Sequence, residues 1–119
     1  MIPRYSRPEM VAIWTDENRY RTWLKVEIAA MRAMVSLGIV PAWALEQVEA
    51  KANFNADKVN EIELTVKHDV IAFLTNVAEY AGEGARYLHF GMTSSDLLDT
   101  AFALQLIQAS ELIESGLTR

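Results

Sequence analysis

Apolar residues recur at three- and four-residue spacing along nearly the whole chain, and no convincing run of strict apolar–polar alternation is present. The clearest stripe lies between Thr15 and Gly38, and its members are Tyr20, Trp23, Leu24, Ile28, Met31, Met34 and Val35. Thr15 can act as the N-cap of this helix, and Gly38 suits the left-handed position that follows a helix end. The pattern therefore predicts an all-α protein with one long helix early in the chain.

Shorter helices are expected on both sides of the long one, over about residues 6–14, 41–52, 56–67 and 69–81. In the first, Ser6 and Glu9 have the spacing of a capping box, with Pro8 in the first turn. Asp69 is a good N-cap for the last, which should end at Gly82. The residues expected to face inward from the helices of residues 41–52, 56–67 and 69–81 are Ala44, Leu45, Val48, Ala52, Val59, Ile62, Val66, Val70, Ile71, Leu74, Val77, Ala78 and Ala81.

The last part of the chain differs in pattern. Residues 86–92 lack helical periodicity and contain Gly91, which indicates an extended connector. Thr93 or Ser94 then caps a last helix of about residues 95–115. Its apolar side chains form two tracks, Leu97, Ala101 and Leu104 on one face and Leu98, Phe102, Leu106, Ala109 and Ile113 on the next. Because so apolar a helix belongs inside a bundle, we expect residues 1–92 to form a small helical N-terminal domain. Residues 93–119 should form the start of a central long-helix bundle domain, and we expect that domain to be truncated in this sequence.

Composition narrows the classes of function. The formal net charge is −5 and the 11 basic residues are scattered, which argues against nucleic-acid binding, because that relies on clustered Lys and Arg. No window approaches the roughly 18 apolar residues of a membrane span, and the first residues lack the apolar core of a secretory signal. There are no cysteines, which excludes disulfides and thiolate metal sites and makes a cytoplasmic location the default expectation.

The two histidines, His68 and His89, each lie in a predicted junction, where functional side chains are more common than inside helices. A histidine is the simplest acid or base near neutral pH. Lys67 and Asp69 flank His68 and add a cation and a carboxylate that could orient the ring. The alternative is a surface turn in which Asp69 only caps the next helix and His68 has no role, and the sequence does not separate the two.

The second candidate is the segment Gly91–Asp96. Glycine lets the backbone approach a ligand, three hydroxyl residues follow Met92, and free backbone N–H groups at a helix start can bind a carboxylate or a phosphate. Asp96 stands three residues after Thr93 and can complete a capping arrangement. Taken alone, the segment is better explained as a well-capped helix, because Ser and Thr caps are common.

Two further positions have charged side chains that need an explanation. Arg4 and Tyr5 can bind a phosphate through a charge-assisted contact and a phenolic hydroxyl, although an N-terminal arm packed against a neighbour is the simpler interpretation. Glu27 lies beside the apolar stripe, where a carboxylate is costly unless paired, and we expect an Arg or Lys of another helix as its structural partner. No phosphate-binding glycine loop, dinucleotide fingerprint or two-histidine metal helix occurs in the sequence.

Three segments together resemble one family. Pro3–Met10 (PRYSRPEM), followed by Ile13–Thr15, resembles the opening of bacterial adenylosuccinate lyases. Lys67–Val70 with Ala72–Phe73 resembles their first histidine segment, and His89–Asp96 (HFGMTSSD) resembles the Thr-Ser-Ser-Asp block of the fumarase and aspartase superfamily. The last block marks the superfamily, whereas the first two narrow the resemblance to adenylosuccinate lyase. The resemblance covers essentially the whole chain.

This resemblance implies an enzyme that eliminates fumarate from adenylosuccinate, giving AMP, and from the matching succinocarboxamide ribotide in purine biosynthesis. It implies a homotetramer that takes a nucleotide substrate, uses no metal or organic cofactor, and builds each active site from three subunits. The implied substrate-binding residues are Arg4, Tyr5, Lys67, His68, Asp69, His89, Thr93 and Ser94. Among them, Arg4 and Tyr5 would contact the nucleotide phosphate, and His68 would act as an acid or bind the substrate.

Two parts of the family's active site have no counterpart in this sequence. They are the second histidine, in a Thr-His segment, and the catalytic serine, in a mobile Ser-Ser loop followed by Met-Pro-x-Lys-x-Asn. Lys67 takes a position that is often Arg in the family, which keeps the charge and loses the bidentate geometry. We therefore expect an N-terminal piece of adenylosuccinate lyase that does not turn over alone. The alternatives are a helical binding or oligomerisation module and a piece of another fumarate-releasing lyase.

Overall fold

The computed structural model describes residues 2–118, and every regular element among them is helical. In chain order they are η1 (Pro3–Tyr5), α1 (Pro8–Ile13), α2 (Asp16–Ser36), α3 (Ala42–Lys51), α4 (Ala56–Val66), α5 (Asp69–Ala81), η2 (Gly82–Tyr87) and α6 (Ser94–Leu117). The η elements are 3-10 helices. The expected all-α fold class is therefore confirmed. Within residues 2–118 no helix is long and apolar enough to cross a membrane.

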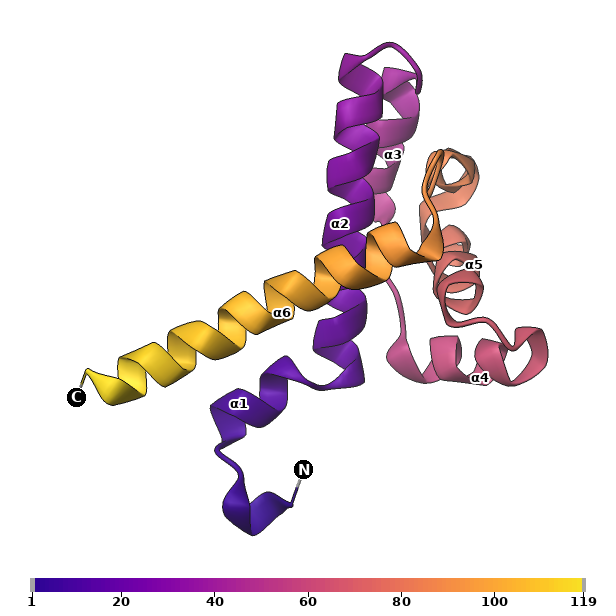
Figure 1. The fold of residues 1–119 in the computed structure, drawn as a ribbon. Helices are drawn as coiled ribbons and strands as arrows, with labels where there is room; N and C mark the ends of the chain where they lie inside the picture. Colours follow the sequence, from indigo (N-terminus) through magenta and orange to yellow (C-terminus); the bar gives the residue numbers. More distant parts are fainter. Residues whose placement is uncertain (1, 119) are drawn as a thin grey trace.

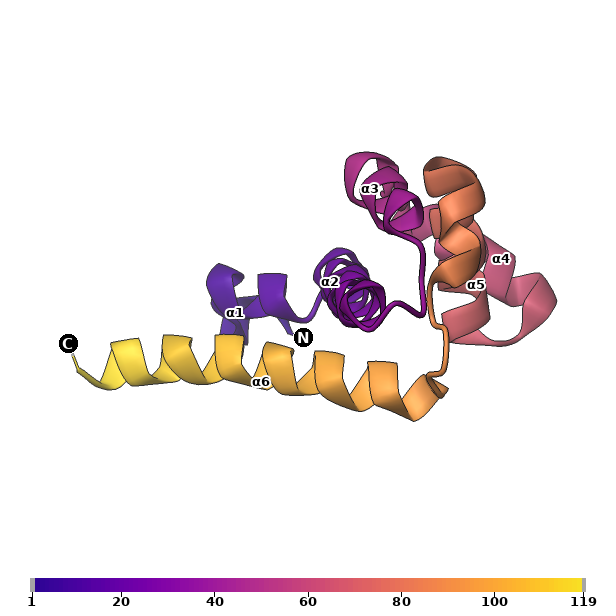
Figure 2. The same cartoon turned by 90° about the horizontal axis from the view of Figure 1, so that it is seen from above.

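Helix α2 is the element around which the others are arranged. Figure 1 shows α3 returning antiparallel beside it, while α4, α5 and η2 form a group on the same side as α3. Helix α6 crosses α2 and continues past it towards α1, and both contacts are made along one side of α6. Figure 2 shows α1 and α2 on that side and none of the described elements along the opposite side. The two sides of α6 therefore have different surroundings.

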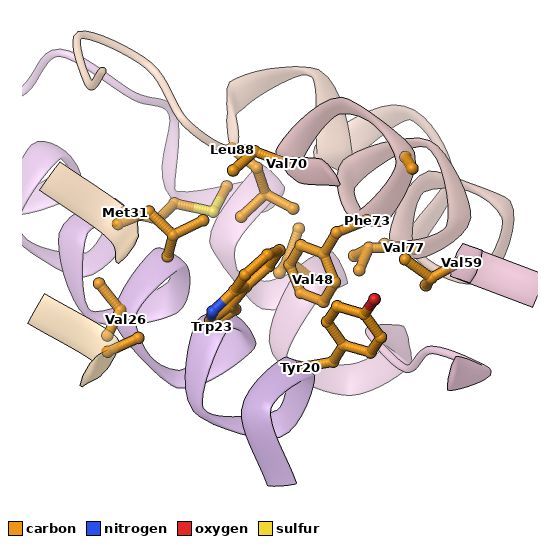
Figure 3. Close-up of a cluster of buried hydrophobic side chains, with 14 of the residues drawn as sticks. Tyr20, Trp23, Val26, Met31, Val48, Val59, Val70, Phe73, Val77 and Leu88 are labelled. Carbon is orange, nitrogen blue, oxygen red and sulfur yellow. The ribbon is translucent and has the colours of Figure 1, made fainter. Parts of the chain in front are cut away.

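The core forms where the apolar stripe of α2 meets α5 (Figure 3). Tyr20 and Trp23 are buried, and both pack on Phe73 of α5, with ring centroids 5.8 Å and 5.4 Å away respectively. The first pair is stacked and the second is edge-to-face, which are the arrangements that aromatic rings prefer. Phe54, just before α4, joins the same cluster at 6.2 Å from Phe73. The stripe predicted from spacing is thus partly confirmed: Tyr20, Trp23 and Met31 are buried and its other members are half-buried, while Val26, which was not predicted, is buried as well.

Several predicted helix ends are confirmed, but the cap predicted at Ser6 is wrong. The Thr15 hydroxyl accepts a hydrogen bond from the Asn18 N–H at 3.2 Å, and Gly38 has a φ of +76° after the end of α2. Ser6 does not cap α1, because its hydroxyl donates to the carbonyl oxygen of Ile2 at 2.6 Å and closes the turn of η1 instead. The N-cap position of α1 falls on Arg7, which provides no side-chain cap.

The inward faces of α4 and α5 were only partly predicted. Val70, Val77 and Ala81 are buried as expected, but Ile71 and Ala78 are exposed. The inner stripe of α5 runs through Val70, Phe73 and Val77, so a residue one position further round the helix points to solvent. Val66 is also exposed, at the last turn of α4.

The predicted extended connector is wrong in its first part, because η2 occupies residues 82–87 as a 3-10 helix. Gly84 lies in it with its N–H donating to the Gln47 side chain of α3. A turn follows and leads to Thr93, which is the N-cap of α6 as predicted. On α6, Leu97 and Ala101 are buried, but Phe102, Leu106 and Ile113 of the second track remain exposed.

Candidate functional site

The first candidate group lies at the junction of α4 and α5. Lys67 ends α4 in the left-handed region with φ 55°. His68, and not Asp69, is the N-cap of α5, since its Nδ1 accepts a hydrogen bond from the Ile71 N–H at 3.2 Å. The predicted cap was therefore one residue late. A ring nitrogen that accepts from a backbone N–H is unprotonated, so the neutral His68 ring carries its proton on Nε2.

Asp69 does not orient the His68 ring through a direct hydrogen bond. Its Oδ1 accepts from the Val70 N–H at 2.8 Å and lies 3.9 Å from His68 Nδ1. Both atoms are acceptors in this arrangement, which explains the long distance. The His68 side chain is 43% exposed, so its Nε2–H is accessible to a ligand or solvent.

The second candidate group joins His89 to Glu27, 62 residues earlier on α2. The Glu27 side chain is fully buried. Its Oε2 accepts from the His89 backbone N–H at 2.8 Å, and its Oε1 lies 2.6 Å from His89 Nδ1. The prediction of an Arg or Lys partner for Glu27 is therefore wrong. The pairing could not be read from the sequence, although a carboxylate on an apolar stripe signalled that some partner was needed.

Thr93 and Asp96 form the capping arrangement that their spacing predicted. The Asp96 carboxylate accepts from the Thr93 backbone N–H at 2.8 Å and from its hydroxyl at 3.2 Å. Ser94, the first residue of α6, is half-buried, while Thr93 is exposed. Thr93 therefore has its own N–H and hydroxyl directed to Asp96, and the segment is a stable helix start whether or not a ligand binds.

Arg4 and Tyr5 lie in η1 and are both exposed. The Arg4 guanidinium carbon stands 4.8 Å from the centroid of the Tyr5 ring, a cation–π contact within the segment. A hollow beside them is lined by Tyr5, Ser6, Arg7, Met10, Leu112 and Ile113. Tyr5 thus lies against the C-terminal half of α6.

The predicted site residues are not gathered in one place by this chain. Ser94 and Leu112 lie 18 positions apart on α6, which corresponds to about 27 Å along the helix axis. Tyr5 lies beside Leu112, so it and Arg4 are far from Thr93 and Ser94 at the start of α6. Figure 1 shows the same separation, because η1 and α1 lie away from the end of α6 at which that helix begins. No group of three or more His, Asp or Glu side chains suited to a metal ion occurs within residues 2–118.

Backbone conformation singles out two of the predicted residues independently. Among residues 2–118 the non-glycine residues with positive φ are Lys67 at 55° and His89 at 63°. Such conformations cost free energy and persist only where the surroundings hold them. Lys67 ends a helix, where the left-handed region is common. His89 does not end a helix, so helix geometry does not explain its positive φ. Its contacts with Glu27 hold it in this conformation.

Comparison with known proteins covers nearly the whole chain. A family model described as lyase matches residues 4–119. An adenylosuccinate lyase of Synechocystis sp. is 56% identical over 113 residues, 95% of this chain and 26% of the relative. An adenylosuccinate lyase of Bacillus subtilis is 45% identical over 119 residues, 100% of this chain and 28% of the relative. The crystal structure of a fumarate lyase from Mesorhizobium sp. BNC1 matches with a TM-score of 0.84 and 25% identity, over 92% of this chain and 26% of that one. The chain thus spans about a quarter of the length of the proteins that it matches.

Proposed function

The chain belongs to the lyase family whose model matches residues 4–119, and from that premise we propose that it supplies part of the active site of an adenylosuccinate lyase. The whole enzyme eliminates fumarate from adenylosuccinate to give AMP, and from the succinocarboxamide ribotide earlier in purine biosynthesis. The observation that carries the proposal is the 45–56% identity to two adenylosuccinate lyases over 95–100% of the chain. The fumarate lyase structure is less similar, at 25% identity.

The chemistry of the two histidine junctions agrees with this reaction. An elimination needs a base for the carbon-bound proton, an acid for the departing nitrogen, and donors for the charge that builds on the substrate carboxylate. His68, with its proton on Nε2 and its ring accessible, suits a hydrogen-bond donor to the substrate. It would act as the acid after its ring takes up a second proton, which it then gives to the departing nitrogen. Ser94 and the backbone N–H groups at the start of α6 suit the donors, while Thr93, whose own N–H and hydroxyl donate to Asp96, would line the substrate site beside them. The serine loop expected to supply the base has no counterpart in residues 1–119.

The separation of the candidate residues supports an assembled active site. Arg4 and Tyr5 stand about 27 Å from Thr93–Ser94 along α6, which is too far for one small substrate to contact both within a single chain. We infer that a site combines segments from different copies in a homo-oligomer, a tetramer in the parent enzyme. Arg4 and Tyr5 would bind the nucleotide phosphate there, and Lys67, Asp69 and His89 would complete the substrate-binding set. The domain boundary at residues 92 and 93 and a cytoplasmic location belong to the same proposal.

The second candidate function is a helical binding or oligomerisation module. Two of the singled-out residues do have a structural task, since His68 and Thr93 are the N-caps of α5 and α6. Titration of AMP into the chain, followed by NMR, separates the two functions. Shifts focused on Arg4, His68 and Thr93 support the lyase site, and shifts absent or spread evenly over the chain support the module.

A chimaera tests the proposed activity. The chain replaces the segment that it matches in the B. subtilis enzyme, where the match covers all 119 residues, and loss of adenylosuccinate absorbance is measured. We expect the chimaera to turn over, and His68→Asn in it to lower kcat by about 10²-fold or more. Asn at that position keeps a capping side chain, so α5 still forms. Glu17→Gln, at an exposed position of α2, is the matched control and should leave kcat unchanged.

A folded chimaera that fails with adenylosuccinate and cleaves another fumarate-yielding substrate would overturn the assignment to adenylosuccinate lyase. The chain by itself should show no turnover, since the serine loop is not among its residues. Measurable turnover by the chain alone would contradict that part of the proposal.

A further inference from the structure

Glu27 is a buried carboxylate with both oxygens directed to one residue. Its side chain has 0% exposure, and its oxygens lie 2.8 Å from the His89 backbone nitrogen and 2.6 Å from His89 Nδ1. It holds His89 at a φ of 63°, where L-residues are uncommon. One side chain of α2 therefore fixes both the backbone and the ring of a residue in the loop before α6.

The arrangement determines where the His89 ring carries its proton. The backbone N–H can only donate, so Glu27 Oε2 must accept. A carboxylate has no proton to give to Nδ1, so at 2.6 Å the ring must donate from Nδ1 to Oε1. Neutral His89 then has an unprotonated Nε2, for which residues 2–118 provide no hydrogen-bond partner. The side chain keeps 20% exposure, so this nitrogen remains accessible.

We propose that Glu27 is a positioning residue that locks His89 in the tautomer with its proton on Nδ1, so that Nε2 faces the substrate site as an acceptor. The proposal deepens the proposed function and rests on it for what Nε2 meets, namely an N–H or O–H group of the substrate or a proton in transfer. The tautomer itself follows from the contacts within the chain.

His68 provides the opposite case in the same molecule. Its Nδ1 accepts from the Ile71 N–H, so the neutral ring carries its proton on Nε2. The two histidines of the chain thus offer different groups to a ligand, a donor at His68 and an acceptor at His89. In an elimination, a donor and an acceptor have different tasks, and a buried carboxylate next to one ring alone is the feature that separates them.

Long-range ¹H–¹⁵N NMR of the ring nitrogens tests the tautomer in the unaltered chain. Because the chain has two histidines, His68→Asn assigns the signals by elimination. Spectra are recorded above the pH at which both rings have lost their second proton. We expect His89 to have a protonated Nδ1 and an unprotonated Nε2, with the reverse pattern for His68. An unprotonated Nδ1 at His89, as a protonated Glu27 would produce, overturns the proposal.

Glu27→Gln tests whether Glu27 is the cause. The His89 N–H still requires an acceptor, so the Gln oxygen turns to it and the Gln NH₂ group faces Nδ1. That nitrogen must then accept, and the His89 tautomer should invert while His68 stays unchanged. Glu17→Gln, which removes the same charge from an exposed position of α2, should leave both rings as they were. A folded Glu27→Gln chain with an unchanged His89 pattern contradicts the positioning role, and the unaltered chain still decides the tautomer if this variant does not fold.

These measurements use no substrate, so their outcome is independent of the proposed activity. An inactive chimaera with the expected tautomers would refute the lyase assignment and leave the role of Glu27 intact. An active chimaera in which His89 has the other tautomer would do the reverse.

Discussion

His68 combines a structural and a chemical task that substitutions can separate. Its Nδ1 caps α5, while Nε2 remains accessible. Loss of an N-cap side chain costs about 1 kcal/mol, whereas Asn is among the best N-cap residues. We therefore expect His68→Ala to lower the free energy of unfolding by about 1 kcal/mol and His68→Asn to leave it nearly unchanged. Urea denaturation measures both, and equal losses in the two variants would show that the cap contributes little.

Tyr20 makes stability depend on alkaline pH. Burial, the largest cause, raises the pKa of its hydroxyl above the ordinary value of 10.0, and the hydroxyl lies 2.7 Å from Asn60 Oδ1. The folded chain therefore keeps this proton to a higher pH than the unfolded chain does. The resulting stability is complete below about pH 10 and is lost as pH rises through the folded pKa.

Tyr20→Phe tests this dependence. Near neutral pH the variant should be less stable by about 0.5–1.5 kcal/mol, because the buried hydrogen bond is lost. The difference from the parent chain should shrink above about pH 10, since only the parent has a proton to lose there. Denaturant unfolding at several pH values measures it, and a difference that stays constant to about pH 11 contradicts the account.

At the scale of elements, two glycines predict opposite effects of adding a methyl group. At Gly84 of η2, a Cβ would stand 2.8 Å from the Ala44 carbonyl oxygen of α3, so Gly84→Ala should cost about 1–3 kcal/mol through overpacking. At Gly116, near the end of α6, a Cβ would meet only the Arg7 guanidinium at 3.7 Å. Gly116→Ala should stabilise the chain by up to about 1 kcal/mol, because Ala favours a helix. Thermal unfolding of both variants measures these effects, and a Gly84→Ala variant as stable as the parent chain would refute the close approach of η2 to α3.

The elements were predictable where their causes are local. The Thr15 cap, the turn at Gly38 and the start of α6 at Thr93 depend on residues within four positions, and the structure has all three. The cap of α5 was misplaced because His68 and Asp69 both carry acceptors, and only the fold decides between them. The conformation of η2 depends on Gln47 of another helix, and the Glu27–His89 contact joins residues 62 positions apart. Residue spacing along the sequence predicts neither of these long-range contacts.

The whole molecule is more extended than its length requires. Its radius of gyration is 16.0 Å, against about 13.5 Å for a compact chain of this size. Helix α6 accounts for the excess, because it runs past α2 and is covered on one side (Figure 2). Leu106 and Ile107 are 44% and 53% exposed there. Each Leu-sized side chain left in water forfeits about 1.5–3 kcal/mol.

We therefore expect the chain to associate with copies of itself through α6. Sedimentation velocity should show an average mass that rises with concentration. The double variant Leu106→Lys and Ile107→Lys should move the equilibrium towards the monomer, while Leu64→Lys, at a 79% exposed position of α4, should leave it unchanged. A monomer at all concentrations in the parent chain would contradict the expectation.

The contact between Glu27 and His89 has a consequence for sequence variation among related proteins. Both oxygens of the Glu27 carboxylate, which has 0% exposure, need a donor, so a change of His89 alone removes the ring donor and leaves Oε1 unsatisfied, whereas Gln at position 27 can still pair with both groups of His89. We therefore expect related sequences without His89 to lack Glu27 as well, while Gln at position 27 is compatible with His89. The identity of a residue in the loop before α6 is thus expected to constrain the identity of a residue on α2, 62 positions earlier.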